Sequence, residues 1–234
     1  MPVADIIVPV FNEEDILEQF YSRVSNLGLD LNLIFIDNAS VDSSLSILES
    51  FQDVTIIRHQ SNEGYGSSLV DGMCHGRCEN IIIIDADCEY PPEAIPHILE
   101  ELRSSDIVYT SRLLHRKSAE DANMPYLKLL GNRIISGLFN ILFDQNTTDL
   151  YTGCKGFKRD CIKGVSFSRM GFEHVLEFAC TLSSRGYSIV DIPVVFEPRN
   201  TGTSKMSHLS ETLKFLYVLA LMKLTLSREK KTEL

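Results

Sequence analysis

Two carboxylates stand one residue apart at the end of a strongly apolar segment. Asp85 and Asp87 directly follow Asn80–Ile84, which contains four consecutive isoleucines. Four β-branched residues in a row predict a strand that is buried on both faces. Such a strand cannot satisfy charged groups, so the carboxylates must lie where the chain leaves the core. In open α/β sheets, this edge is where ligands bind.

The types and spacing of these two residues also indicate a chemistry. Paired hard oxygen ligands suit Mg²⁺ or Mn²⁺ that carries a phosphorylated substrate. A strand followed by an ordinary acidic turn would have the same sequence, so the pair alone leaves both interpretations open.

Composition limits the classes of protein to which the chain can belong. Its 234 residues, 44% hydrophobic and 23% charged, are typical of one soluble globular domain with a substantial core, here 1–234. The formal net charge of −10 argues against a general nucleic-acid binder. An anionic substrate must therefore meet locally placed cations.

The cysteines and the apolar segments indicate the compartment. Cys74 and Cys78 are four residues apart, but no second pair or nearby His cluster completes a zinc pattern. We therefore expect reduced thiols in a cytoplasmic protein. We expect no signal peptide, because Asp5 interrupts the apolar start, and no segment that spans a membrane.

The first part of the chain alternates between strand and helix patterns. Strands are expected at 5–10, 31–36, 54–58 and 81–84. A helix is expected at about 14–27 with Asn12 as N-cap, a second helix runs through Ile47 and Phe51, and a third lies at about 67–76. This alternation predicts a parallel sheet with right-handed crossovers. The polar loops Asn12-Glu13, Asp37-Asn38 and Asp85–Asp87 should then converge on one edge of it.

The second part is less regular. We expect helices from Pro91 to about Leu102, at 126–143 and near 173–185, strands at 106–110 and 188–196, a loop from Asp149 through Lys158, and a final helix. The apolar segment Phe215–Leu226 fits either a helix packed on the core or an amphipathic helix on a membrane. Without a Walker loop or a Gly-X-Gly-X-X-Gly after the first strand, an ordinary Rossmann dehydrogenase is disfavoured.

An ordered set of motifs resembles the family 2 glycosyltransferases with the GT-A fold, closest to the dolichol- or polyprenyl-phosphate sugar synthases. The matching segments are Val8–Glu13, Asp85–Glu93, Thr110–Arg112, Gly131–Arg133 and Arg199–Lys205. The resemblance implies an α/β fold with a Rossmann-like nucleotide-binding half and a mostly parallel central sheet flanked by helices. It also implies a nucleotide-sugar half at about 1–112 and an acceptor half at about 113–234.

The resemblance implies a role for each matching donor-side residue. Pro9, Phe11, Glu13 and Asp37 would hold the nucleoside, Gly64 would allow close approach of backbone and nucleotide, and Asp85, Ala86 and Asp87 would hold the sugar-nucleotide diphosphate. Asp85, Asp87 and Glu89 would bind the metal, Mg²⁺ or Mn²⁺. Phe11 stands where the family usually has Tyr, and Asn38 stands where a second Asp is common.

The implied reaction is the inverting, metal-dependent transfer of a hexose to a polyprenyl or dolichyl phosphate. GDP-mannose is the favoured donor, and UDP-glucose is compatible. The metal at Asp87 would neutralise the leaving diphosphate, with Arg199 and Lys205 adding cations from a loop. Arg112 and Arg133 would bind the acceptor phosphate, because guanidinium groups match phosphate oxygens. Asp149 would organise the acceptor loop.

Two other functions fit the same motifs. One is a family 2 glycosyltransferase that acts on a saccharide, which needs a carboxylate base. The other is a non-catalytic sugar-nucleotide-binding subunit. In the favoured interpretation the protein lies peripherally at the cytoplasmic face of a membrane, with a membrane-anchored partner subunit among its candidate partners and no nucleic acid.

Overall fold

The fold is a mixed α/β structure built around one twisted sheet. A computed structural model describes residues 1–114, 126–197 and 208–232. Within them, seven strands form the sheet in the order β3-β2-β1-β4-β6-β5-β7. Their bounds are β1 Ala4–Val10, β2 Leu31–Asp37, β3 Val54–Arg58, β4 Asn80–Ile84, β5 Ile107–Ser111, β6 Cys154–Lys158 and β7 Ile189–Pro193. Only β6 runs antiparallel to its neighbours in the described sheet.

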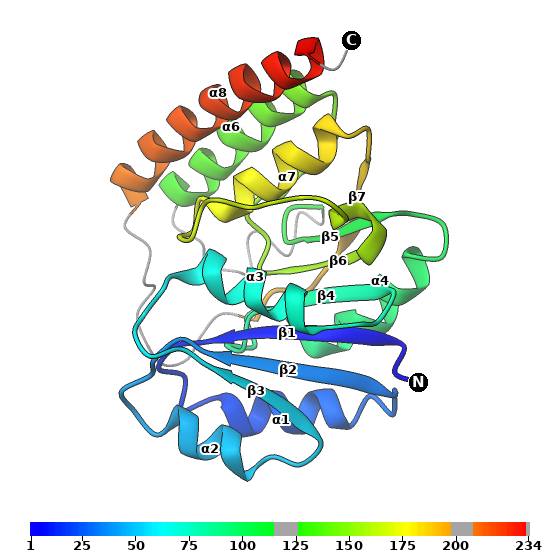
Figure 1. Ribbon diagram of the computed structural model, residues 1–234, viewed down its shortest axis with the longest axis vertical. Helices are drawn as coiled ribbons and strands as arrows, with labels where there is room; N and C mark the ends of the chain where they lie inside the picture. The colour runs from blue at the N-terminus through cyan, green and yellow to red at the C-terminus, as the bar shows by residue number, and fades with distance from the viewer. Residues whose placement is uncertain (115–125, 198–207, 233–234) are drawn as a thin grey trace.

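Helices cover both faces of this sheet (Figure 1). One apolar core joins the sheet to α1 (Leu17–Ser25), α2 (Ser44–Ser50), the short η1 (Pro92–Ala94) and α4 (Ile95–Glu101). The other joins it to α3 (Tyr65–His75), α6 (Tyr126–Phe143), η2 (Arg159–Ile162), α7 (His174–Ser184) and α8 (His208–Thr232). In Figure 1, α6, α7 and α8 lie side by side at the top, on the far side of the molecule from α1 and α2.

The isoleucine segment is buried on both faces, as its sequence predicts. Ile81 and Ile83 belong to the core under α3 and α7, whereas Ile82 and Ile84 belong to the core under α1 and α4. All four side chains are fully buried. Because the polar chain can emerge only after Ile84, Asp85 is fixed at the carboxyl end of β4.

Two local predictions are wrong. Helix α1 begins at Leu17 with Ile16 at its N-cap, so Asn12 does not cap it. Asn12 has φ 54° and instead accepts a hydrogen bond from Val41 N–H at 2.8 Å. The expected loop from Asp149 through Lys158 contains β6, which pairs antiparallel with both β4 and β5.

The C-terminal helix α8 packs on the protein core. Phe215, Val218, Leu219 and Met222 are buried in the core that α7 and α3 share. Lys223 points inward, where its Nζ donates to the Leu142 carbonyl and lies 4.9 Å from the Phe143 ring centroid. The described part of α8 thus follows the core-packing alternative. No helix in the described residues combines the length and apolar character needed to cross a bilayer.

A buried carboxylate ties the start of β1 to distant parts of the chain. Asp5 is fully buried, and its Oδ2 accepts from Arg159 Nη2 at 2.6 Å and from Cys78 N–H at 2.7 Å. Its Oδ1 accepts from Asn32 Nδ2 at 2.6 Å. This network joins β1, β2, the α3–β4 turn and η2 at the edge opposite the carboxyl ends of β1, β2 and β4. Cys78 and the other five cysteines form no disulfide.

We expect Asp5→Ala to destabilise the protein strongly, because it leaves the Arg159 guanidinium without its buried counter-charge. Removing one partner of a buried pair typically costs about 3–5 kcal/mol of unfolding free energy. Urea denaturation measures the loss. The exposed Asp30→Ala is the matched control and should change stability by less than about 0.5 kcal/mol. Equal effects of the two substitutions would contradict a structural role for the Asp5 network.

Candidate active site

The ends of three strands and several later segments line a cavity of about 430 Å³. At the strand ends it is lined by Pro9 of β1, by Phe11 and Glu13 after β1, by Asn38 after β2, and by Asp85, Ala86, Asp87 and Glu89 after β4, and four of these residues are carboxylates. Its lining from later parts of the chain includes the largely apolar side chains of Tyr151, Phe172, Val175 and Phe215. The predicted convergence of the polar loops on one sheet edge is therefore present in the structure.

The loops after β1 and β2 hold each other by hydrogen bonds. Asn12 N–H donates to Ser40 Oγ at 3.0 Å, and Glu13 N–H donates to Ser44 Oγ at 2.8 Å. In the sheet, Val10 is paired with Asp37, so the two loops start from adjacent positions. Small hydroxyl side chains in 40–44 thus satisfy backbone donors that would otherwise lack partners.

A chain of amide side chains supports the cavity wall after β2 and β3. Asn38 Oδ1 accepts from Glu63 N–H at 2.8 Å, and Asn38 Nδ2 donates to Asn62 Oδ1 at 3.1 Å. Asn62 Oδ1 also accepts from Gly64 N–H at 3.0 Å. Asn38, Asn62 and Gly64 all line the cavity. An amide at position 38 therefore supplies both a donor and an acceptor, which a carboxylate could not do.

Gly64 is required by the protein's own backbone. It has φ 94°, and a Cβ there would lie 2.3 Å from the Met170 carbonyl oxygen. The same oxygen accepts from Gly66 N–H at 2.7 Å. Gly64 thus makes a close approach to residue 170, which fixes the start of α3 against the segment before α7.

Tyr65, the first residue of α3, holds Asp85 in place. Its hydroxyl donates to Asp85 Oδ1 at 2.9 Å, and its ring stacks on Phe172 with centroids 5.1 Å apart. Burial, and next the Asp85 carboxylate, raise the pKa of Tyr65 well above its ordinary value, so the hydroxyl keeps its proton. A carboxylate oriented in this way has a defined direction into the cavity.

Asp85, Asp87 and Glu89 provide a donor set that fits Mg²⁺ or Mn²⁺. All three line the cavity, and their ligand atoms are hard carboxylate oxygens. Asp87 Oδ1 accepts from Glu89 N–H at 2.9 Å, which turns the chain sharply after β4, and Cys88 in between has φ 57°. A Cβ at Gly153 would lie 2.3 Å from Asp85 Oδ2, so only glycine leaves room for that carboxylate.

Arg112 is already paired inside the protein. Its Nε and Nη2 donate to the two carboxylate oxygens of Asp149 at 2.6 and 2.8 Å, and both side chains are almost completely buried. Burial alone would raise the pKa of Asp149, but the Arg112 guanidinium and the Asn132 amide hold it below its ordinary value. Asn132 Nδ2 donates to Asp149 Oδ1 at 2.7 Å. Arg112 still lines the cavity, with its guanidinium 5.3 Å from the Tyr90 ring centroid.

Two other predicted residues, Arg133 and Asp37, do not line the cavity. Arg133 is exposed on α6 and does not line the cavity, whereas its neighbour Asn132 reaches inward to Asp149. Asp37 lies behind the cavity wall, and its Oδ2 is buried without a hydrogen-bond partner among the described residues. Arg199 and Lys205 lie outside the described residues.

Lys155 is a buried charge that the sequence did not indicate. It lies on β6 between Ile83 of β4 and Tyr109 of β5, and its Nζ has no hydrogen-bond partner within the described structure. Burial lowers its pKa to about 8, and the nearby Asp85 carboxylate opposes this shift. His174 on α7 faces the same core, where burial, and next Lys155, lower its pKa to about 4. Recognition of β6 as a central strand would have revealed Lys155, because both faces of this strand are buried.

We expect Lys155→Met to stabilise the protein, because it replaces a buried cation without a hydrogen bond by an apolar side chain of similar size. The pKa of Lys155 is lower in the folded state than its ordinary 10.5. Protonation therefore favours unfolding, and this cost is fully present below pH 8 and disappears as the pH rises toward 10.5. Urea denaturation should show a larger gain for Lys155→Met at pH 7 than at pH 10. An equal gain in unfolding free energy at both pH values would contradict the presence of a buried charge at Lys155.

The chain is similar in sequence to known proteins. Glycosyl transferase family 2 matches residues 5–165. A dolichol-phosphate mannosyltransferase from Pyrococcus furiosus is 27% identical over 91% of this chain and 62% of its own length. An undecaprenyl-phosphate mannosyltransferase from Micrococcus luteus is 24% identical over 86% of each chain. The chain thus spans less than two thirds of the Pyrococcus protein but most of the Micrococcus protein.

Solved structures share the fold. The glucosyl-3-phosphoglycerate synthase from Mycobacterium tuberculosis, in complex with Mn²⁺, uridine-diphosphate-glucose and phosphoglyceric acid, has a TM-score of 0.70 and 16% sequence identity. The similarity covers 95% of this chain and 80% of that one. The match over residues 5–165 and this shared architecture together show that the chain belongs to glycosyl transferase family 2 and has the GT-A fold.

Proposed function

We propose that this chain transfers a hexose, with inversion, from a nucleotide-diphosphate sugar to a polyprenyl or dolichyl phosphate. GDP-mannose is the favoured donor. The observation that carries the proposal is the placement of Asp85 and Asp87 at the strand ends, on the wall of a cavity that is also lined by the apolar groups of Tyr151, Phe172, Val175 and Phe215. In this proposal 1–234 is a single catalytic domain, with a nucleotide-sugar half at about 1–112 and an acceptor half at about 113–234.

On the donor side, the protein's own groups would position the nucleotide and its diphosphate. Pro9, Phe11, Glu13 and Gly64 provide the wall for the nucleoside, with Asp37 behind it. Asp85 and Asp87, with Glu89, would hold Mg²⁺ or Mn²⁺, which when bound neutralises charge on the leaving diphosphate. Tyr65 would keep Asp85 oriented through the hydrogen bond from its hydroxyl. Arg199 and Lys205 would add positive charge beside the same phosphates.

On the acceptor side, Arg112 is the cation that the geometry favours. Nε and Nη2 are bound to Asp149, and within the described structure Nη1 makes no hydrogen bond, so this corner of the guanidinium is left for a phosphate oxygen. A phosphate monoester has a second pKa near ~6 and is already an anion at neutral pH, so it needs positioning more than a base. Asp149 is buried and held as a carboxylate by Arg112, which suits it to positioning Arg112 rather than to proton transfer.

Mannose transfer to a lipid phosphate is also supported by the relatives. The proteins from Pyrococcus furiosus and Micrococcus luteus are described as mannosyltransferases that act on dolichol phosphate and undecaprenyl phosphate. The apolar wall formed by Tyr151, Phe172, Val175 and Phe215 is a suitable surface for the first part of an isoprenoid tail. The Mycobacterium tuberculosis structure was obtained with a soluble phosphate acceptor, so the fold alone does not select a lipid.

The exposed face of α6 supports a peripheral position on the membrane. Leu130, Ile134, Leu138 and Ile141 recur at helical spacing, and all four are exposed, Ile141 by 81%. We call these four residues the α6 stripe. Arg133 stands beside it, as expected for a cation that meets lipid headgroups. We therefore assign the membrane contact to α6, because Phe215, Val218, Leu219 and Met222 of α8 are buried in the protein core.

The transfer reaction itself tests the proposal. The full chain is incubated with labelled GDP-mannose or UDP-glucose, with Mg²⁺ or Mn²⁺, and with polyprenyl phosphate in detergent, a saccharide, or phosphoglycerate as acceptor. We expect labelled polyprenyl-phosphate sugar, with GDP-mannose the better donor. Asp87→Asn should lower the rate by about 100-fold or more, as when one electrostatic stabiliser is removed from an active site.

Asp106→Asn is the matched control for Asp87→Asn, because Asp106 lies at the opposite end of the sheet and pairs with Lys158. It should keep the full rate. Transfer to the saccharide or to phosphoglycerate alone would overturn the lipid acceptor. Nucleotide binding without transfer to any acceptor would show a non-catalytic subunit.

We expect the double variant Ile134→Glu, Ile141→Glu to bind liposomes at least roughly 100-fold more weakly, because burial of each large apolar side chain contributes about 1.5–3 kcal/mol, or about 3–6 kcal/mol for the two. Co-sedimentation with liposomes that contain polyprenyl phosphate measures the loss. Both side chains are exposed, so the melting temperature should not change. Leu29→Glu, on the turn between α1 and β2, is the control, and an equal loss there would contradict a contact through the α6 stripe.

A further inference from the structure

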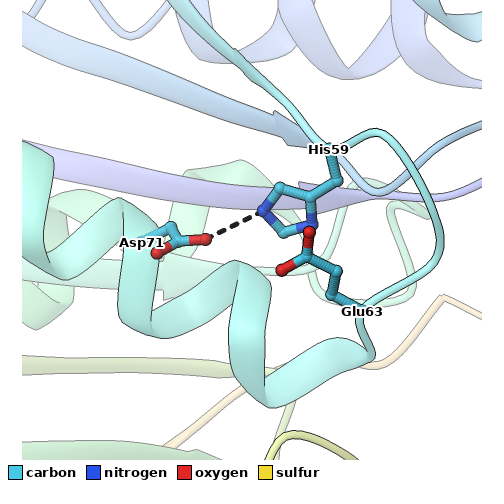
Figure 2. Close-up of side chains that lie close together, drawn as sticks. All are labelled: His59, Glu63 and Asp71. Carbon is cyan, nitrogen blue, oxygen red and sulfur yellow. Dashed lines mark hydrogen bonds and ion pairs between the residues drawn. The ribbon is translucent and has the colours of Figure 1, made fainter.

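A histidine and two carboxylates converge next to the cavity but do not line it. His59 follows β3, Glu63 lies in the turn before α3, and Asp71 lies within α3, as Figure 2 shows. One ligand atom from each lies within 4.8 Å of the other two. His59 is buried, with 6% of its surface exposed, whereas the Asp71 side chain is 45% exposed. The group is therefore anchored on a buried ring and open to solvent on one side.

The surrounding hydrogen bonds fix which nitrogen of His59 carries a proton. Glu63 N–H donates to Asn38 Oδ1, so this atom is the amide oxygen, and His59 Nδ1 lies 2.9 Å from it. The orientation of Asn38 is supported further, because its Nδ2 donates to an Asn62 oxygen that also accepts from Gly64 N–H. Nδ1 of His59 must therefore be the donor.

This assignment leaves two acceptors facing each other. A neutral imidazole has one N–H, so with Nδ1 protonated, Nε2 carries a lone pair. Nε2 lies 2.9 Å from Asp71 Oδ2, which as a carboxylate oxygen can only accept (Figure 2). The contact is favourable only if a cation is present between or beside these atoms, either a second ring proton or a metal ion.

Several features favour a metal ion. Glu63 brings a second carboxylate to the ring, so one proton would leave the group with net negative charge, whereas a divalent ion would balance both carboxylates. Metal-binding histidines usually donate their other N–H to an oxygen, as His59 does to Asn38. The exposed side at Asp71 provides a path for the ion and room for water ligands.

We propose that His59 Nε2, Glu63 and Asp71 bind a divalent transition-metal ion, with Zn²⁺ as the representative, at a site separate from Asp85 and Asp87. A mixed set of one imidazole and two carboxylates suits Zn²⁺ better than Mg²⁺, which prefers oxygen ligands alone. Binding would displace any second proton from Nε2. The site does not depend on the proposed transfer reaction.

The same hydrogen bonds connect this site to the cavity. His59 contacts Asn38, and Asn38 contacts Asn62, and both asparagines line the cavity. An ion that joins the turn at Glu63 to α3 at Asp71 would hold this part of the wall in one conformation. Zn²⁺ should therefore raise the melting temperature of the whole chain, because a ligand that binds only the folded state stabilises it.

The test uses the full chain, stripped with a chelator and then titrated with ZnCl₂ in the presence of excess MgCl₂ to occupy sites formed by oxygen ligands alone. Calorimetry gives the affinity, diffraction at the zinc absorption edge locates the ion, and ¹⁵N NMR of the imidazole reports metal binding at Nε2. We expect a zinc peak between the three side chains, an Nε2 shift and a higher melting temperature.

Asp71→Asn and Glu63→Gln each remove one carboxylate ligand. Substitution of groups that only hydrogen-bond to metal ligands typically lowers metal affinity by roughly 10- to 100-fold, so each variant should lower the zinc affinity by at least this factor. Both substitutions keep side-chain size at exposed carboxylates, so the chain should still fold. Glu79→Gln, at an exposed position beyond α3, is the matched control and should bind zinc as the unchanged chain does. A zinc peak at the exposed Cys74, an Nε2 that stays protonated at saturating zinc, or unchanged affinity in both variants would overturn the proposal.

Discussion

The central sheet is buried on both faces, and this constraint decides where the protein can place charge. Along β4, alternate isoleucines enter two different cores, so no position within the strand can carry an ionised group at low cost. Charged and amide side chains gather after the last buried residue of β1, β2 and β4, and these ends are adjacent because the strands are parallel and in register. The cavity is thus a consequence of the sheet, and its polar side would persist in any chain with this order of strands and loops.

The first half of the sheet could be predicted from the sequence because its strands and helices follow one another locally. The antiparallel β6 could not. Its residues include two lysines and Gly156, which together hide the apolar pattern of a buried strand. Gly156 is needed because a Cβ there would lie 2.3 Å from the Ile98 side chain of α4. The insertion of β6 between β4 and β5 depends on residues about 45 to 80 positions away in sequence, and no local propensity encodes such pairing.

In the candidate site, the sequence could likewise indicate which residue types matter, but it could not indicate which distant residues contact them. The sequence identified the Asp85 and Asp87 carboxylates and the chemistry that they favour, because their position after a buried strand is a local feature. It also selected Arg112, but the carboxylate that binds it, Asp149, is 37 residues away. On α6 the sequence favoured Arg133, whereas the helix turns Asn132 toward the core and Arg133 toward solvent. A one-residue difference on a helix changes direction by about 100°, and only the packing of α6 on its neighbours decides which residue points inward.

Because β6 belongs to the same sheet as β4, the second half of the chain contributes directly to the wall that the first half forms. The Gly153 carbonyl, one residue before β6, accepts from Asp85 N–H at 3.1 Å, and the Met170 carbonyl before α7 accepts from Gly66 N–H of α3. Lys155 of β6 adds an electrostatic interaction with Asp85 to these backbone contacts. With a pKa of about 8 it is mainly protonated at neutral pH, and its charge interacts with Asp85 through a core in which no described residue forms a hydrogen bond to its Nζ. The second half of the chain therefore acts on the central carboxylate of the first half through backbone contacts and through charge. A substitution in β6 should consequently change the position or the electrostatic environment of Asp85, even where it leaves the surface of the cavity unchanged.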